Sequence, residues 1–115
     1  MRESRLMQLM LLDFYGELLT EKQRECYDLH FNEDLSLSEI AEQSGISRQG
    51  VWDNIRRAEA SMRQIEEMTG LIRRFTQNRK AQERLRDKLE ALRVRCEGES
   101  RVLAEEALEL LDSFL

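Results

Sequence analysis

The chain has 115 residues, a formal net charge of −5, 36% charged residues and no proline. This length suits a single domain, and the negative charge argues against a general nucleic-acid binder, whose affinity depends on neutralising phosphates. No run of about 18 apolar residues is present, and Glu3 interrupts the apolar start, so the sequence predicts no membrane insertion and no signal peptide. We therefore expect an all-helical, cytoplasmic protein.

The residues with catalytic or metal-binding chemistry are few and scattered. Cys26 and Cys96 are far apart, no CxxC pair occurs, and His30 is the single histidine. These residues lack the clustered spacing of a metal site, so we expect two buried thiols and an ordinary helical histidine near the surface. No glycine-rich phosphate loop follows a strand pattern. The sequence thus predicts no enzyme, no catalytic residue, no metal and no cofactor.

The first two helices are predicted by apolar spacing and by a cap. The first helix has an apolar face that should lie in the core: Leu6, Met7, Met10, Phe14 and Leu18, widened by Leu11 and Tyr15. Thr20 and Gln23 form a capping-box pattern that opens a second helix. Its expected inward residues are Cys26, Tyr27, Leu29 and either His30 or Phe31, and it should end at 32–34.

Residues 35–58 have the pattern of a helix-turn-helix. Ser36 and Glu39 form a second capping box, Gly45 stands where a left-handed residue ends the helix, and Ile46 should fill the turn. Ser47 then caps another helix whose spacing turns four residues inward: Val51, Ile55, Ala58 and Met62. We expect this helix to continue through Ile65 to a break at 69–70.

The outer face of that helix is the candidate binding surface. Its residues are Arg48, Gln49, Trp52, Asp53 and Arg56, followed by Arg57. Residues 48–80 hold eight basic and four acidic residues, whereas residues 21–47 hold two and seven. Such a face can enter a major groove, but a glycine turn between two helices also occurs in small all-α domains without that role. Spacing alone leaves both readings open.

The motifs of this region resemble two known families. Residues 19–24, 35–41 and 45–48, with Val51, Ile55, Arg57 and Ala58, resemble the fourth conserved region of bacterial sigma factors. Residues 12–15 and 18–20, and 47–49 running into 51–57, resemble the YlxM family of small bacterial helix-turn-helix proteins over about residues 6–68. Where that family commonly has Ala and Tyr, this chain has Gly50 and Trp52. The Gly weakens the first helical turn by up to about 1 kcal/mol relative to Ala.

The YlxM resemblance implies a function. It implies a non-enzymatic accessory or regulatory protein of the signal recognition particle pathway, with the particle's protein or RNA as partner. Trp52 and Asp53 favour a protein or ribonucleoprotein partner, because indole rings are enriched at interfaces and a carboxylate repels phosphate. The alternative is a DNA-binding regulator, in which Arg48 contacts guanine or phosphate, Gln49 adenine and Asp53 cytosine, while Arg56 and Arg57 hold the backbone.

The remaining sequence predicts a helical extension, residues 69–115, after the helix-turn-helix domain of residues 1–68, in one continuous folding unit. A long helix from Leu71 should be partly solvated over 73–80 and packed over 85–96, along the row Leu71, Phe75, Asn78, Gln82, Leu85, Leu89, Leu92 and Cys96. After 97–99 we expect Ser100 to cap a last helix that returns antiparallel along Leu103, Ala107, Leu110 and Phe114. Leu108, Leu111 and Leu115 add surplus apolar surface, which fits either a homodimer through these helices or packing onto the first helix.

Overall fold

A computed structural model describes residues 2–114, which form an all-α structure without strands. The elements are α1 (Arg2–Tyr15), the short 3₁₀ helix η1 (Gly16–Leu18), α2 (Glu21–Phe31), α3 (Leu37–Ser44), α4 (Arg48–Thr69), α5 (Leu71–Arg95) and α6 (Glu99–Asp112). Within residues 2–114, none of the helices combines the length and the hydrophobicity that a membrane-spanning segment requires. The predicted all-helical class is confirmed.

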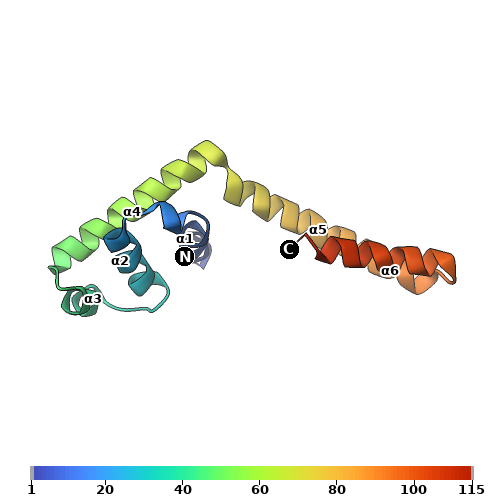
Figure 1. The fold of residues 1–115 in the computed structure, drawn as a ribbon, viewed down its shortest axis with the longest axis horizontal. Coiled ribbons are helices and arrows are strands. Elements are labelled where there is room, and N and C mark those ends of the chain that lie inside the picture. The colour runs from blue at the N-terminus through green and yellow to red at the C-terminus, as the bar shows by residue number, and fades with distance from the viewer. Residues whose placement is uncertain (1, 115) are drawn as a thin grey trace. The chain divides into compact units, whose positions relative to one another are not determined.

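The chain divides into two compact units, one ending at Ile72 and the other beginning at Arg73. The boundary expected from the sequence, between residues 68 and 69, precedes the Gly70 turn, whereas the first unit includes the start of α5. In that unit α4 packs against α1, α2 and α3, as the ribbon in Figure 1 shows. This arrangement makes α4 the central element of the helix-turn-helix unit.

The predicted caps and turn are confirmed. The Oγ atom of Ser36 accepts from the Glu39 amide at 3.1 Å, and the Glu39 carboxylate accepts from the Ser36 amide at 3.0 Å. That hydrogen bonding holds the pKa of Glu39 below its usual range. Thr20 and Gln23 form the other capping box, and Gly45 ends α3 with a φ of 72°. The two helices of the motif thus begin and end where their local chemistry requires.

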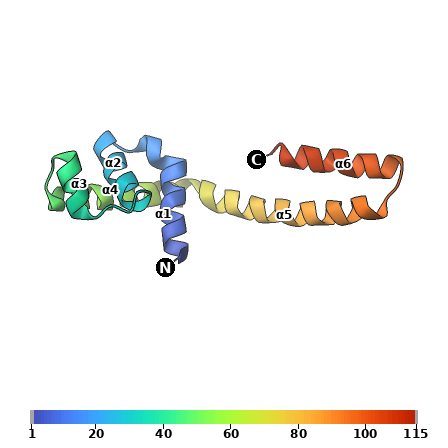
Figure 2. The ribbon, with the colours of Figure 1, turned by 90° about the horizontal axis from the view of Figure 1, so that it is seen from below.

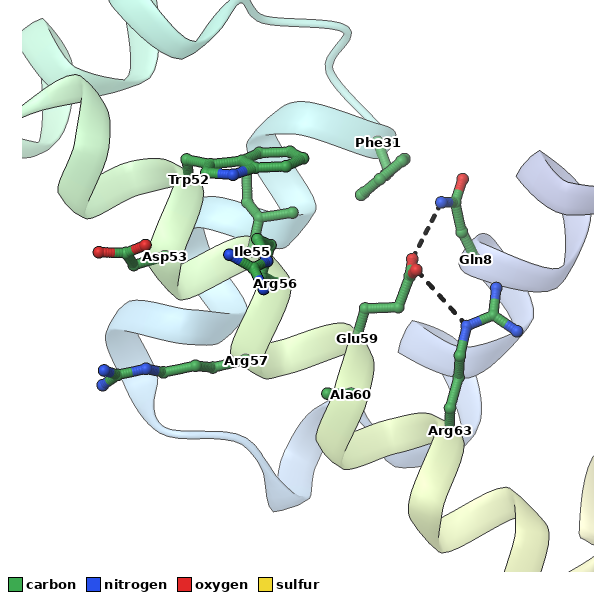
Figure 3. A pocket seen from close by; sticks show the side chains of 10 residues that line it. All are labelled: Gln8, Phe31, Trp52, Asp53, Ile55, Arg56, Arg57, Glu59, Ala60 and Arg63. Atoms are coloured by element: carbon green, nitrogen blue, oxygen red, sulfur yellow. Dashed lines mark hydrogen bonds and ion pairs between the residues drawn. The ribbon is translucent and has the colours of Figure 1, made fainter.

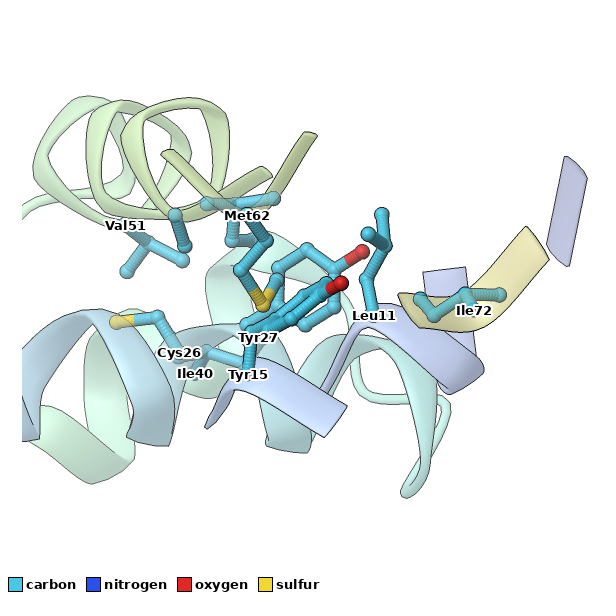
Figure 4. Close-up of a cluster of buried hydrophobic side chains, with 10 residues drawn as sticks. Leu11, Tyr15, Cys26, Tyr27, Ile40, Val51, Met62 and Ile72 are labelled. Carbon is cyan, nitrogen blue, oxygen red and sulfur yellow. The ribbon is translucent and has the colours of Figure 1, made fainter. Parts of the chain in front are cut away.

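The inward row of α4 is also confirmed. Val51, Ala58 and Met62 are fully buried and Ile55 is 3% exposed. They meet Cys26 and Tyr27 of α2, Ile40 of α3 and Leu11 and Tyr15 of α1 in one cluster, most of which is drawn in Figure 4. Burial raises the pKa of the Cys26 thiol. The Nδ1 atom of His30 bonds to the Leu35 carbonyl oxygen at 2.9 Å, as expected of a satisfied histidine.

The apolar face of α1 differs from the prediction. Leu6 and Leu18 are 60% and 68% exposed, and Phe14 is also exposed, whereas Leu11 and Tyr15 are buried. Met7 and Met10 are partly buried against the core. The predicted row of Leu6, Met7, Met10, Phe14 and Leu18 therefore lies to one side of the buried face, whose centre is at Leu11 and Tyr15. The reason is that α1 is apolar over more than half of its circumference. The 3₁₀ turn at η1 then removes Leu18 from the helical period.

The core of the first unit extends past the Gly70 turn. Ile72 is 1% exposed and belongs to the same apolar cluster, whereas the preceding Leu71 is exposed. The Tyr15 hydroxyl donates to Glu66 at 2.5 Å, and the Glu66 carboxylate accepts from the Ile72 amide at 2.9 Å. These bonds join α1 and the end of α4 to the first turn of α5.

In the second unit, α5 and α6 form the predicted antiparallel hairpin (Figure 2), but with different facing residues. Leu85 and Leu92, expected to pack, are 48% and 51% exposed. The half-buried row of α5 is Gln82, Arg86, Leu89, Arg93 and Cys96. The row keeps the predicted period, but the long stems of Arg86 and Arg93 occupy the positions assigned to leucine.

The return helix α6 is rotated in the same way. Leu103, Leu110 and Phe114 are 64%, 66% and 74% exposed, while Ala104 and Leu111 are buried. Ala107 and Leu108 are half-buried. Ser100 is not the cap: Gly98, with a φ of 64°, precedes the first helical residue, and no side chain caps the helix. Leu115 lies outside the described residues.

Candidate functional site

The predicted outer face of α4 is presented to solvent. Arg48, Gln49, Arg56 and Arg57 are exposed, and Trp52 is 42% exposed. Asp53 is half-buried. The first turn that carries this face is fixed by Ser47, whose Oγ accepts from the Gly50 amide at 3.0 Å. The structure therefore places all six residues on one helix, although it does not bring them into one hollow.

Trp52 separates two open hollows. A groove of about 670 Å³ between α4, α1 and the end of α2 is lined by Trp52, Asp53, Arg56 and Arg57, together with Gln8, Phe31, Ile55, Glu59, Ala60 and Arg63. A hollow of about 490 Å³ on the other side is lined by Leu37, Arg48, Gln49 and Trp52. Among the six predicted residues, Trp52 alone lines both hollows. An aromatic ridge flanked by two hollows is suited to a complementary apolar side chain of a partner.

The groove has an aromatic end and a polar end (Figure 3). The rings of Trp52 and Phe31 lie at one end, and Gln8, Glu59 and Arg63 lie at the other. The side chains of Asp53 and Arg57 project from α4 to the side opposite Gln8 and Phe31.

Two side chains needed for base readout are already bonded to each other. The Nε2 atom of Gln49 donates to the Asp53 carboxylate at 3.1 Å, one turn along the helix. Gln49 would have to break this bond to present its amide to adenine in the bidentate manner. The Asp53 carboxylate also stands between Arg48 and Arg56 in sequence and opposes their attraction for phosphate. With these side-chain contacts, the outer face is poorly arranged for base-specific recognition of DNA.

Glu59 fixes the polar end of the groove. Its carboxylate accepts from the Gln8 side-chain amide at 2.9 Å and from the Tyr27 hydroxyl at 3.1 Å, and Arg63 lies 3.4 Å away. Burial, with the Glu59 charge beside it, raises the pKa of Tyr27. This cluster joins α1, α2 and α4, so it holds the groove walls at a set separation.

Six residues that line the groove were not predicted as part of the site: Gln8, Phe31, Ile55, Glu59, Ala60 and Arg63. Two features of the sequence could have revealed part of this set. Glu59 lies four residues after Ile55 and three before Met62, at the edge of the buried row, where a carboxylate requires partners. Tyr27, predicted to point inward, likewise requires a partner for its buried hydroxyl. Gln8 and Phe31 had no local signal, because their place depends on how α1 and α2 pack on α4.

The groove combines cationic, amide, carboxylate and aromatic side chains. Within residues 2–114, no three His, Cys, Asp or Glu side chains come together in a way that could hold a metal ion. The polar groups of the groove are arginines, one amide and two carboxylates, beside two aromatic rings. This combination can bind an extended or helical segment that offers apolar side chains and carboxylates.

Comparison with known proteins agrees with this architecture. The model of the UPF0122 family, described as "Putative helix-turn-helix protein, YlxM / p13 like", matches residues 2–99. A UPF0122 protein of Acetivibrio thermocellus is 53% identical over 79 residues, 68% of each chain. One of Geobacillus kaustophilus is 53% identical over 67% of this chain and 70% of its own. One of Exiguobacterium sibiricum is 43% identical over 86% of this chain and 90% of its own. The chain therefore belongs to the UPF0122 family of YlxM-like helix-turn-helix proteins.

Proposed function

We propose that this chain is a cytosolic, non-enzymatic accessory or regulatory protein of the signal recognition particle pathway. In this proposal the outer face of α4 is a docking surface for the particle's protein or RNA. The pathway assignment is supported by the resemblance of residues 6–68 to YlxM proteins. The docking mode is carried by one observation: Trp52, 42% exposed on the recognition helix, has an open hollow on each side.

Electrostatics favours a protein partner at this face. Arg56 lines the groove and makes no ion pair with a described residue, whereas Arg63 already pairs with Glu59. The Arg56 guanidinium can therefore pair with a carboxylate of a partner, while Trp52 contacts its apolar side chains. The particle's protein component is accordingly the first partner to test, and its RNA the second.

The test uses Trp52 as an intrinsic probe. Trp52 is the only tryptophan of the sequence, so emission excited at a wavelength that tyrosine does not absorb reports on this face alone. The chain is titrated separately with the particle's protein component, with its RNA and with random-sequence duplex DNA. The proposal predicts a saturable emission change with the protein or the RNA. Saturation with duplex DNA alone would overturn it.

DNA-binding regulation is the second candidate, and the exposed arginines of α4 are the observation that favours it. Arg48, Arg56 and Arg57 are all exposed on the helix that follows the turn, the position of a recognition helix. The substitution Asp53→Asn separates the two candidates, because it removes the charge that opposes phosphate while keeping the shape. If Asp53→Asn binds one duplex sequence more tightly than the parent does, DNA-binding regulation is favoured. If neither protein prefers any duplex sequence, DNA-binding regulation is opposed.

A further inference from the structure

The α5–α6 hairpin has two chemically different sides. One side carries ion pairs: Arg86 pairs with Asp112 across the hairpin, and Arg101 lies 3.9 Å from Glu105 along α6. Asp112, Arg101 and Glu105 are exposed and Arg86 is half-buried, so this side of the hairpin is largely solvated. The hairpin's own interior is small, since Ala104 and Leu111 are its only buried hydrophobic residues within the described part of the chain.

The other side carries exposed apolar residues. They are Leu85 and Leu92 of α5, Leu103 and Leu110 of α6, and Phe114 just beyond the end of α6, which together we call the hairpin face. Their exposed fractions run from 48% to 74%. Residues seven apart lie on one side of a helix, so Leu85 with Leu92, and Leu103 with Leu110, each form a single row.

Helical geometry places both rows on the same side of the hairpin. Each residue turns a helix by about 100°, so Leu85 points about 100° away from Arg86, and Leu110 about 160° away from Asp112. Because Arg86 and Asp112 meet on one side, both rows turn toward the other. The hairpin face is therefore one continuous apolar surface built from two helices.

We propose that the hairpin face of one protomer packs against the same face of a second copy, with α5 lying antiparallel over α6 of the partner. The result is an antiparallel four-helix bundle with a two-fold axis parallel to the helices. Such an interface is self-complementary, since each protomer supplies the same surface, and it gives the thin hairpin the core that it lacks.

Charge complementarity identifies the second copy as the occupant. Helix α5 contains nine basic and three acidic residues, whereas α6 contains one basic and five acidic residues. At the outer edge of the hairpin face, Lys88 and Arg95 border the α5 row, and Glu99 and Glu106 border the α6 row. None of these four makes an ion pair within residues 2–114.

The same charges select one arrangement of the two copies. Stacking α5 on α5 of the partner would bring basic edges together, which is repulsive. Stacking α5 on α6 of the partner brings Lys88 and Arg95 beside Glu99 and Glu106, and the two-fold axis repeats this contact on the other edge. The charge pattern therefore specifies orientation as well as association.

The first experiment measures the mass of the full chain by sedimentation equilibrium over a range of concentrations. We expect a species of twice the 13.7 kDa chain mass. Leu110→Glu changes an exposed side chain, so the fold and its helical circular dichroism should persist while association weakens by at least about 10-fold. If the parent protein has the mass of one chain at every concentration, the proposal is wrong, and the hairpin face must bind a different partner. Unchanged association in Leu110→Glu would also overturn it.

The second experiment tests orientation by charge exchange. One variant carries Lys88→Glu with Arg95→Glu, and the other carries Glu99→Lys with Glu106→Lys. Each variant alone should associate at least about 10-fold more weakly than the parent. Mixed in equal amounts, they should form a heterodimer, because both edges then pair opposite charges. Glu105→Lys, on the ion-paired side, is the matched control and should leave association unchanged. Mixed variants that stay monomeric would refute the α5-over-α6 arrangement.

Discussion

Replacing Glu59 with leucine should destabilise the helix-turn-helix unit by about 3 kcal/mol. The Glu59 carboxylate accepts two hydrogen bonds, from Gln8 at 2.9 Å and Tyr27 at 3.1 Å, and hydrogen bonds to a charged group contribute about 1.5–3 kcal/mol each. Arg63 adds little, because its side chain is 48% exposed and its ion pair is screened. Part of the loss is recovered, since the Tyr27 hydroxyl also donates to the Gln8 carbonyl oxygen at 3.3 Å.

Urea denaturation followed by Trp52 emission measures this loss in the unit that contains it. Glu59→Gln keeps an acceptor oxygen and should cost only about 1 kcal/mol, while glutamate, glutamine and leucine have similar helix propensities. Glu67→Leu, at an exposed position of the same helix, is the matched control and should change stability by less than about 0.5 kcal/mol. A Glu59→Leu protein as stable as the parent would refute the role assigned to the cluster.

Three further predictions follow from the turn, the cap and the buried tyrosine. Gly45→Val should cost about 1–2 kcal/mol from backbone strain alone, because φ is 72° and an added Cβ meets no atom within 4 Å; a parental melting temperature would contradict this. Gly50→Ala should raise the free energy of unfolding in urea melts by about 0.5–1 kcal/mol, because the gain in helix propensity outweighs a 3.2 Å contact of the new Cβ with the Ser47 hydroxyl. A lower stability than the parent would mean that the hydroxyl cannot move away from the added Cβ. In the folded protein the pKa of Tyr27 lies above its ordinary value of 10.0, so the contribution of Tyr27 to stability should be complete below pH 10. Above pH 10 the free energy of unfolding should fall by up to about 1.4 kcal/mol per pH unit. Urea melts at stepped pH should show a smaller slope for Tyr27→Phe than for the parent, and an equal slope would refute this prediction.

Local chemistry made the helix-turn-helix predictable. Ser36 with Glu39, and Gly45, determine helix ends through contacts three or four residues away, so the sequence contains all the information required. The inward row of α4 was likewise predictable, because Val51 and Ile55 recur at a helical period between polar residues. The candidate surface followed as the opposite side of that row.

Tertiary packing decided the features that the sequence analysis missed. The α5–α6 hairpin turns Leu85 and Leu110 outward although their spacing is as regular as that of the buried rows, because each helix is apolar on more than one side. Spacing then cannot select which side faces the partner helix. Phe31 and Glu59 entered the groove for a related reason, since the site forms only where α1, α2 and α4 meet.

The most direct test of the docking surface compares the loss of partner affinity in two variants of its outer face. Trp52→Ala should weaken binding of the particle's protein component by about 2 kcal/mol or more with little salt dependence, whereas Arg48→Ala with Arg56→Ala should weaken it less. All three side chains are exposed or partly exposed, so both variants should fold like the parent. If the arginine pair instead dominates and lowers the salt slope by about two units on duplex DNA of any sequence, the face binds the DNA backbone, and the docking account is wrong.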